Sequence, residues 1–386
     1  MMIYSGRIAF VVILLQCFNN FVACQKIEAT CSDNVNMILQ ASKCTCIQTR
    51  ELGALPNIDC ADSSDPTNFK NIFSFFNYFL TKDGEQNFGR FTVTNNVDFE
   101  IVENFFQNTT FKEVYLGTSN NESKISRIHP EAFNGPISQT LEILTVRSEN
   151  LGHNNDLFKS LLKLKNLRKV SIEGKYLTNI PRKAFCENTK HKESTFPYLE
   201  EIRFYTTEEA RRIFVESIGA HAFWNLPSLR LVSVGNQMIK KIGVRAFGLP
   251  EPSKTKLVID LSNQWNKDFS YEVFLTETFS NLNRPVELNL YDNHNLEYLN
   301  EGVFYKFLQQ NVQNRIRLGQ TLNCNCKMAW LYRNKQFKDQ FIPWSFEDQN
   351  IPKYDVLCKG KMPLWDIEEV YFSGCLGRIE EEKEEL

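Results

Sequence analysis

Ile218-Gly-Ala-His-Ala-Phe223 is followed in the chain by Leu231-Val-Ser-Val234 and then by Ile242-Gly-Val-Arg-Ala-Phe247. The pattern is a short run in which two apolar residues flank a polar one, then a polar turn, then a phenylalanine. It recurs every 23 to 32 residues between Phe88 and Cys326. Repetition at such a period is typical of a solenoid, in which each repeat packs only on its neighbours.

The apolar pairs predict parallel strands, because alternate residues of a strand point to opposite sides. The phenylalanines predict a second row of core side chains on the other side of each repeat. The predicted strand centres are Phe91-Thr-Val93, Val114-Tyr-Leu116, Leu144-Thr-Val146, Val170-Ser-Ile172, Ile202-Arg-Phe204, Val232-Ser-Val234, Ile259-Asp-Leu261, Leu288-Asn-Leu290 and Ile316-Arg-Leu318. The predicted core phenylalanines are Phe106, Phe133, Phe185, Phe223, Phe247, Phe279 and Phe304.

The first 24 residues have the composition of a secretory signal peptide. An apolar run at residues 8–15 follows Arg7, and small Val22 and Cys24 suit cleavage before Gln25. No later run approaches the roughly 20 apolar residues that cross a bilayer. We therefore expect a secretory-pathway protein without a membrane span.

The last four residues, Lys383, Glu384, Glu385 and Leu386, are close to the signal that retains proteins in the endoplasmic reticulum. Glu384 stands where Asp is most usual. The alternative is that the acidic run from Glu380 onward is only a solvated tail. The sequence thus leaves secretion from the cell and retention in the lumen both open.

Of the eleven cysteines, Cys17 and Cys24 lie in the expected signal peptide, and eight of the others fall into two groups of four, each with a C-x-C pair. In a secreted chain such groups predict two disulfides each, with three possible pairings per group. A zinc site is the rival interpretation, but zinc sites usually use C-x2-C pairs. Cys186 is left over and is expected to be a buried free thiol, or else to join two chains. The groups are Cys31, Cys44, Cys46 and Cys60, and Cys324, Cys326, Cys358 and Cys375.

Cys324-Asn-Cys326-Lys-Met-Ala-Trp330-Leu331, with Cys358 and Cys375, resembles the C-terminal cap of extracellular leucine-rich-repeat proteins. Cys44-Thr-Cys46 with Cys60 resembles their N-terminal cap, and Ile128-His-Pro-Glu-Ala-Phe133 resembles the convex half of their repeat. The resemblance covers roughly residues 31 to 376. It implies an α/β solenoid of horseshoe form, with a concave parallel sheet and disulfide-bonded caps. The pairs that it implies are Cys31–Cys46, Cys44–Cys60, Cys324–Cys358 and Cys326–Cys375.

The repeats depart from that family in the asparagine that it carries at the ninth position. Asn96 and Asn293 meet the pattern, whereas Gln237 falls there in another repeat unless the register is shifted to Asn236. The irregular spacing also resembles the group named after the non-catalytic subunit of a shrimp (oplophorus-luciferin) luciferase. That second resemblance implies an accessory subunit of a secreted enzyme.

The expected organisation has five parts. They are a signal peptide (1–24), an N-terminal cysteine-rich cap (25–87), about nine leucine-rich repeats (88–322), a C-terminal cysteine-rich cap (323–376) and an acidic tail (377–386). Two sequons, at Asn108 and Asn121, predict glycosylation.

The outward side chains of the strands predict a protein-binding concave face, since Tyr and Arg are enriched at binding hot spots. The five histidines are scattered, and no H-E-x-x-H, P-loop or G-x-S-x-G motif occurs, so we expect neither an enzyme nor a cofactor. A net charge of −2 argues against nucleic acid as the partner. The alternatives to a secreted protein-binding role are an accessory subunit of a secreted enzyme and a lumenal protein that binds clients. The candidate residues are Tyr115, Arg147, Arg203, Tyr205, Tyr291 and Arg317.

Overall fold

The computed structural model describes most of the chain from Asn87 to Ile342 and parts of both ends. None of the helices in this part of the chain is long and apolar enough to cross a membrane. The described residues are 36, 39, 44–47, 55–61, 72–73, 87–94, 99–117, 124–148, 151, 156–174, 176–190, 193–205, 214–265, 269–342, 356–359, 362–368, 371–372 and 375. The expected signal peptide, Asn121 and the acidic tail with Lys383, Glu384, Glu385 and Leu386 lie outside them.

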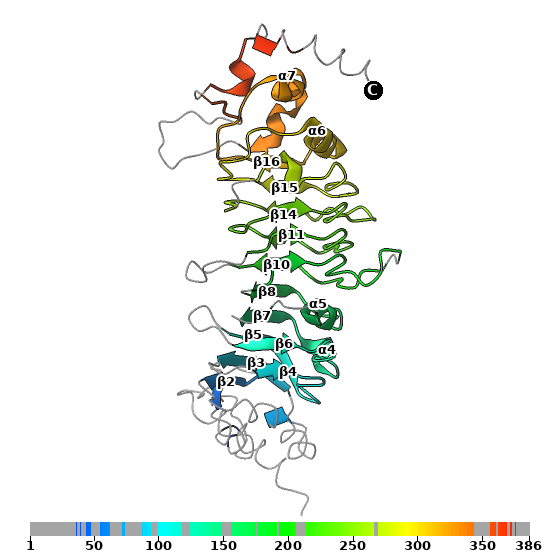
Figure 1. Ribbon diagram of the computed structural model, residues 1–386. Coiled ribbons are helices and arrows are strands. Elements are labelled where there is room, and N and C mark those ends of the chain that lie inside the picture. The colour runs from blue at the N-terminus through cyan, green and yellow to red at the C-terminus, as the bar shows by residue number, and fades with distance from the viewer. Residues whose placement is uncertain are drawn as a thin grey trace, which may run out of the picture.

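One long sheet runs through the molecule and gives it an elongated form (Figure 1). Within the described residues it has twelve strands, and their order in space is their order in the sequence. Neighbouring strands are parallel, except that β1 is antiparallel to β2. The strands are β1 (Thr45–Ile47), β2 (Asn57–Ala61), β3 (Asn87–Thr94), β5 (Thr110–Leu116), β7 (Ile143–Ser148), β8 (Lys169–Gly174), β10 (Glu201–Phe204), β12 (Leu231–Ser233), β14 (Leu257–Asp260), β15 (Val286–Asn289), β16 (Arg315–Arg317) and β17 (Phe341–Ile342).

The nine predicted strand centres correspond to nine consecutive strands of this sheet, β3 to β16. Their inward residues are buried and pair in register; Val114, for example, lies opposite Phe91 on one side and Leu144 on the other. Strands β1, β2 and β17 extend the sheet into both end regions and were not predicted. A solenoid with a mostly parallel sheet is therefore confirmed, whereas the horseshoe curvature stays a prediction.

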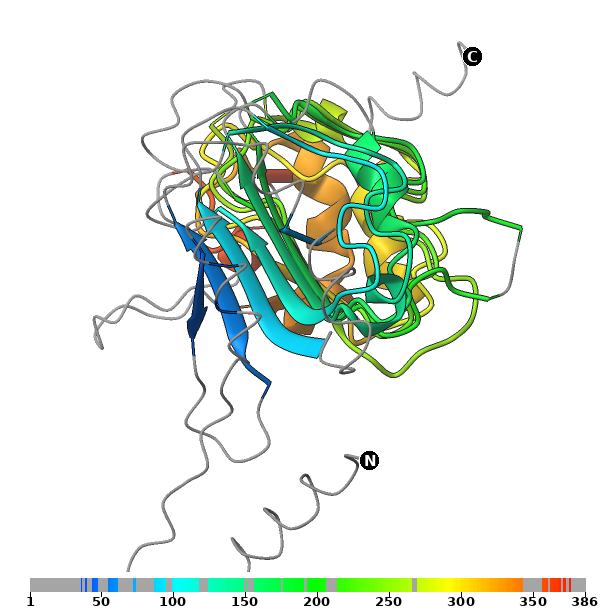
Figure 2. The ribbon, with the colours of Figure 1, turned by 90° about the horizontal axis from the view of Figure 1, so that it is seen from below.

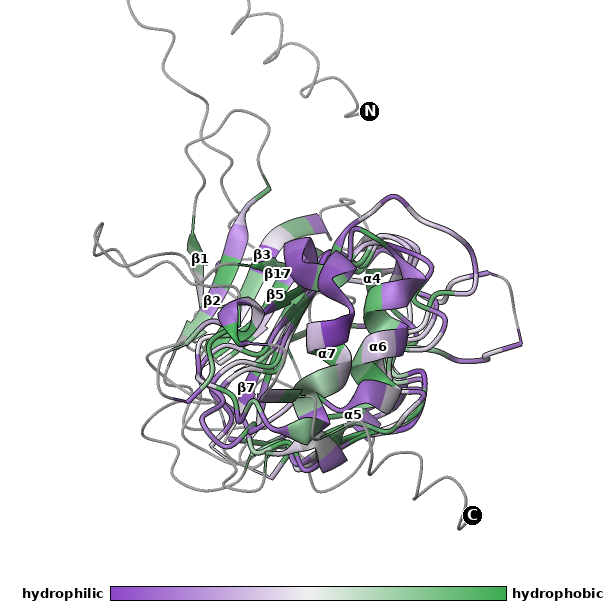
Figure 3. Cartoon of the chain, turned by 90° about the horizontal axis from the view of Figure 1, so that it is seen from above, coloured by the Kyte–Doolittle hydropathy of each residue, from purple (hydrophilic) through white to green (hydrophobic). Residues whose placement is uncertain are grey.

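The side of the molecule opposite the main sheet, here called the back, is built from short strands, turns and helices (Figures 2 and 3). β4 (Phe99–Ile101) pairs with β6 (Ile125–Ile128), and β9 (Asn179–Ile180), β11 (Ser217–Ile218) and β13 (Lys241–Ile242) form a small parallel sheet. The helices are α4 (Ile137–Thr140), α5 (Asp156–Leu161), α6 (Glu301–Gln310) and α7 (Ala329–Arg333), with 3-10 turns η1 (Tyr271–Val273), η2 (Cys326–Met328), η3 (Lys335–Gln340) and η4 (Leu364–Asp366).

The predicted core phenylalanines are all buried, and most of them pack on the next one along the stack. The rings of Phe185, Phe223 and Phe247 stack with centroid separations of 5.6 and 5.4 Å. Phe158 was missed because helix α5 replaces the usual turn in its repeat. Its ring meets Phe185 edge-on at 5.9 Å, an orientation that aromatic pairs favour.

A row of buried amides includes Asn293, one of the two asparagines expected at the ninth position, and the other, Asn96, lies outside the described residues. The side-chain amide of Asn293 donates to the carbonyl of Leu261 at 2.9 Å and accepts the backbone N–H of Gln264 at 2.8 Å. Gln264 and Gln237 make equivalent bonds in the two preceding repeats. Gln237 rather than Asn236 therefore occupies the ninth position, and the predicted register is confirmed there.

Disulfides hold both ends of the solenoid. Three disulfides lie between described residues, and each joins two cysteines that the family resemblance had paired. Cys46 is disulfide-bonded as well, and Cys31 lies outside the described residues. At the C-terminal end, buried Trp330 of α7 donates its indole N–H to the carbonyl of Leu299 at 2.9 Å. The disulfides are Cys44–Cys60, Cys324–Cys358 and Cys326–Cys375.

Candidate protein-binding face

The outward side chains of the parallel strands form one continuous surface, here called the strand face. Strand pairing brings one residue from each of the ten strands β2 to β16 into a central row. Small polar side chains dominate this row, which keeps it open to solvent and to a partner. In spatial order the row is Asp59, Thr92, Tyr115, Thr145, Ser171, Arg203, Ser233, Asp260, Asn289 and Arg317.

The structure places the six candidate residues on the strand face or at its edge, but they are distributed along eight consecutive strands, β5 to β16, rather than gathered in one cluster. Tyr115, Arg203 and Arg317 stand in the central row. Arg147 lies near the end of β7, and Tyr205 and Tyr291 follow the ends of β10 and β15. Of the six, the structure brings Arg147 and Tyr205 into direct contact, with the guanidinium carbon 5.0 Å from the ring centre.

Arg147 also contacts Glu173, its neighbour in register on β8, through an ion pair of 3.4 Å. Glu173 is only 5% exposed, and neither of its carboxylate oxygens accepts a hydrogen bond from a described residue. A buried carboxylate depends strongly on a nearby cation. Glu173 therefore fixes Arg147, and Arg147 in turn orients the ring of Tyr205.

Tyr115 has a similar arrangement at the N-terminal end of the face. Arg90 lies over its ring at 4.9 Å and donates to the carboxylate of Glu113 at 2.7 Å. Burial, followed by the charge of Glu113, raises the pKa of the Tyr115 phenol. Arginine stacked on tyrosine thus occurs twice on the strand face, each time with a carboxylate beside the arginine.

Asp260 organises the C-terminal half of the face and was not among the candidates. Its carboxylate accepts hydrogen bonds from the hydroxyls of Ser233 at 2.9 Å and Ser262 at 2.7 Å, and from the side-chain amide of Asn289 at 2.9 Å. Three strands are tied together by this one side chain. An outward Asp among small polar residues in neighbouring strands is the signal that could have identified it.

Glu287 is a second carboxylate shared between strands. It pairs with Lys256 at 2.6 Å and with Arg317 at 3.2 Å. Burial alone would raise the pKa of Glu287, but the hydrogen bonds and charges of Lys256 and Arg317 outweigh it and lower that pKa. Arg317 is therefore partly neutralised before any partner binds.

Three large aromatic side chains stand exposed just beyond the C-terminal ends of the strands, and we call them the aromatic edge. Tyr205 is 39% exposed, Trp265 60% and Tyr291 39%. They follow β10, β14 and β15, with only β12 between β10 and β14 in the sheet. Trp265 was missed because it lies five residues beyond its central-row residue, outside the strand pattern.

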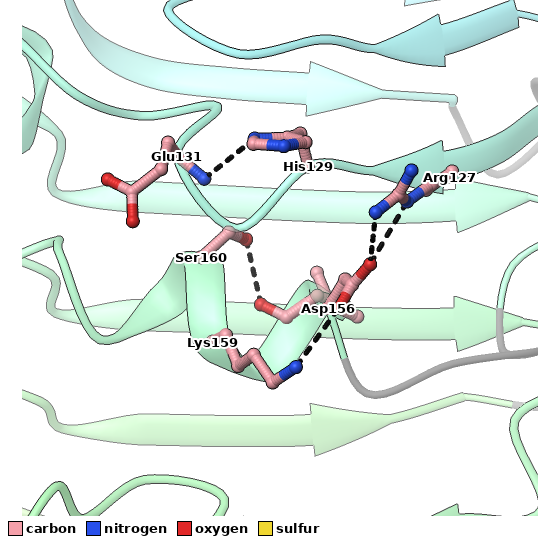
Figure 4. A network of polar contacts seen from close by, with 7 residues as sticks. Arg127, His129, Glu131, Asp156, Lys159 and Ser160 are labelled. Carbon is pink, nitrogen blue, oxygen red and sulfur yellow. Dashed lines mark hydrogen bonds and ion pairs between the residues drawn. The ribbon is translucent and has the colours of Figure 1, made fainter.

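Polar contacts on the back are of a different kind and support the fold. Arg127 of β6 donates twice to Asp156 of α5, at 2.8 and 3.0 Å, and Lys159 adds a third contact at 3.3 Å (Figure 4). His129 accepts the backbone N–H of Glu131 at 3.1 Å through Nδ1, so it is a structural histidine (Figure 4). Among the described residues no group of His, Cys, Asp and Glu could hold a metal ion.

Of the two sequons, the one at Asn108 can be placed. Asn108 is exposed in the turn before β5, and Thr110 of the same sequon donates to the side-chain oxygen of Asn87 at 2.5 Å. Glycosylation of Asn108 stays a prediction. Cys186 is buried, 4% exposed, and forms no disulfide within the described residues.

No family model matches the chain, and no curated protein matches it. Among solved structures, the crystal structure of human 5T4 (Wnt-activated inhibitory factor 1, Trophoblast glycoprotein) is 14% identical, covers 83% of this chain and 92% of that chain, and has a TM-score of 0.30. A likeness this weak carries no argument about function. None of the comparisons supports the resemblance to the shrimp luciferase subunit group.

Proposed function

We propose that this chain is a binding protein that holds another protein against its strand face. The aromatic edge carries the proposal: three exposed aromatic side chains stand beside a rigid sheet of polar residues. Tyrosine and tryptophan provide large contact areas and lose little rotamer freedom on binding. Exposed apolar groups that gather on one part of a protein surface often mark an interaction site.

The charges of the face indicate what kind of partner it suits. Most of its charged groups are already paired with each other across strands, as in Arg90–Glu113, Lys169–Glu201 and Arg317–Glu287. Such a face offers little net charge to a polyanion. A partner with its own aromatic and neutral polar groups fits better than nucleic acid.

The organisation expected from the sequence forms part of the proposal. The five segments 1–24, 25–87, 88–322, 323–376 and 377–386, the horseshoe curvature and the secretory location are proposed on sequence grounds. The disulfides support an oxidising compartment, in which such bonds persist. Retention in the lumen through Lys383–Leu386 is the alternative to secretion.

Photo-cross-linking from single positions tests the binding face. A photoreactive amino acid at Arg203, in the central row, is expected to capture the physiological partner in cells that make the protein. The same group at Lys306, exposed on helix α6 at the back, serves as the matched control. Capture of one protein from position 306 and none from position 203 would contradict the proposal.

The location is tested separately by comparing the full chain with a chain that ends at Glu382. Both chains appear in the medium if the tail is only solvated. If only the shortened chain appears there, Lys383–Leu386 retains the protein and the partner belongs to the lumen.

A further inference from the structure

Basic residues occupy one equivalent position in three successive repeats at the back. Lys183, His221 and Arg245 each stand two residues before a buried core phenylalanine, and Arg182 precedes the first of them. The backbone N–H groups of Lys183 and His221 each donate to a carbonyl of the next repeat, at 3.1 and 3.2 Å. The turns therefore rest directly on one another, and we call these four residues the basic row.

The backbone, not attraction between side chains, forces these residues together. Lys183, His221 and Arg245 have φ angles of 58°, 57° and 50°, a left-handed conformation that is uncommon for residues other than glycine. A Cβ atom at Gly219 would overlap the backbone of Arg182, and one at Gly243 would overlap the backbone of the turn before it. Only glycine permits turns to stack this closely.

The basic row has little compensating negative charge. Burial is the main cause that lowers the pKa of His221, and the positive charges of Arg182, Arg245 and Lys183 lower it further. Glu277 pairs with Arg245 at 3.4 Å, but both side chains are about half exposed, and such surface pairs stabilise weakly. Arg182 and Lys183 have no ion-pair partner among the described residues.

Several nitrogen atoms at the same place also lack hydrogen-bond partners among the described residues. His221 Nδ1, Trp224 Nε1 and Arg245 Nε are buried and have no hydrogen-bond partner among the described residues. The rings of His221 and Trp224 touch edge-on, 5.1 Å apart, and Trp224 is 7% exposed. This contrasts with His129 in Figure 4, whose Nδ1 is satisfied by a backbone N–H. Unpaired buried groups are uncommon and call for an explanation.

We propose that the basic row binds sulfate groups, at a site on the opposite side of the molecule from the strand face. Arg182 is exposed and the other three residues are partly exposed, so an anion in solvent can reach their charged groups. Adjacent turns at a spacing of about 4.8 Å make the row roughly 10 Å long, enough for several sulfates along one saccharide chain. Sulfate suits the row because it stays fully ionised and only accepts hydrogen bonds, whereas a phosphate ester takes up a proton near pH 6 and then carries less negative charge.

Calorimetric titration at constant ionic strength tests the site, with inorganic sulfate and a heparin-derived hexasaccharide as probes and the desulfated hexasaccharide as the control ligand. Replacing Lys183→Gln together with Arg245→Gln is expected to lower the affinity about tenfold or more. Glu277→Gln is expected to raise the affinity about threefold, a gain that misfolding does not produce. Lys306→Gln, on α6, removes one charge elsewhere on the back and is expected to change nothing.

The two probes distinguish the source of the sulfate. If the hexasaccharide binds tightly and the inorganic ion weakly, the ligand of the basic row is a sulfated polysaccharide. If both bind with comparable affinity, the ligand is the free sulfate ion. Absence of binding to either probe would overturn the proposal. So would an equal loss of affinity in Lys306→Gln, which would indicate a general charge effect, or tighter binding of a phosphorylated peptide.

Acidification gives a second test through His221. The charged groups that face it from the neighbouring turns are Arg182, Lys183 and Arg245, with Glu277 attached to the last. Protonation of His221 adds a charge and a donor. Because the pKa of His221 is lowered, affinity for the hexasaccharide should rise as the pH falls below the usual histidine range, below about 6.5. His221→Asn, which tolerates the left-handed backbone, should abolish that rise. An equal rise in affinity in both proteins would show that His221 does not contribute to the site.

Discussion

Arg147 lies over the ring of Tyr205, and the contact reaches across a whole strand of the sheet. Arg147 belongs to β7, Tyr205 follows β10, and Glu173 of β8 lies between them as the ion-pair partner of Arg147. Two planar side chains are thereby held in position before a partner arrives. Groups that are ordered in advance lose less entropy on binding.

Glu173 makes this arrangement sensitive to substitution. We expect Arg147→Met to destabilise the fold by about 3 kcal/mol, because it leaves a buried carboxylate without its cation. The double variant Arg147→Met with Glu173→Gln should recover most of that loss, since no buried charge then remains. Chemical denaturation of the three proteins measures both effects, and equal stability of the single and double variants would contradict the account.

The buried amide row predicts a large effect at Gln264. Replacing Gln264→Leu removes the acceptor of the Ile239 N–H at 3.0 Å and the donor to the Val234 carbonyl at 2.8 Å, and should cost about 2 to 4 kcal/mol. Gln309→Leu, at an exposed position of helix α6, is the control for the same chemical change. Thermal unfolding of both variants compares them. A Gln264→Leu protein as stable as the control would rule out a structural role for the amides.

Glu287 predicts a specific dependence on pH. Its pKa is lowered in the folded protein, so its ion pairs stabilise the fold above the unfolded pKa, and that contribution is lost as the pH falls through the folded pKa. Glu287→Gln should therefore be less stable than the native chain at pH 7, by about 1 kcal/mol, with the difference disappearing at strongly acidic pH. Melting temperatures measured from pH 7 downward test this. A difference that stays constant across the range would exclude linkage to this carboxylate.

Cys186 is predicted to be inert in the native protein. Its thiol is buried, and burial is the main cause that raises its pKa, so little reactive thiolate is exposed. Iodoacetamide should label it in denaturant and leave it unmodified in the folded chain. Rapid labelling of Cys186 in the native protein, seen by peptide mass spectrometry, would contradict this and would again favour a disulfide-linked dimer.

The strands could be predicted because a repeat shows the same alternation nine times, so chance errors at one repeat are corrected by the next. Strands β1, β2 and β17 could not, because they lie outside the repeat and owe their pairing to the caps. The burial of Arg284 is a further feature that the repeat pattern did not predict. Arg284 is fully buried and donates to the carbonyls of Leu226 and Leu229 at 2.6 and 2.8 Å, while burial lowers its pKa to about 10.

On the binding face, too, features set by neighbouring residues in the sequence could be predicted, and features set by contacts between strands could not. The outward positions of Tyr115, Arg203 and Arg317 follow from alternation alone. The contact between Arg147 and Tyr205 depends on the register of three strands, which a single sequence does not specify. Trp265 stands in a loop, where no periodic pattern indicates exposure.

The affinity of the strand face for the partner captured by cross-linking tests the central claim most directly. The decisive comparison is between Tyr205→Ala with Tyr291→Ala and the back variant Lys306→Gln, each measured beside the native chain by surface plasmon resonance. Loss of two aromatic contacts should weaken binding by about a hundredfold, and the back variant should bind as the native chain does. Unchanged affinity in the double variant, with a correct fold by circular dichroism, would contradict binding through this face.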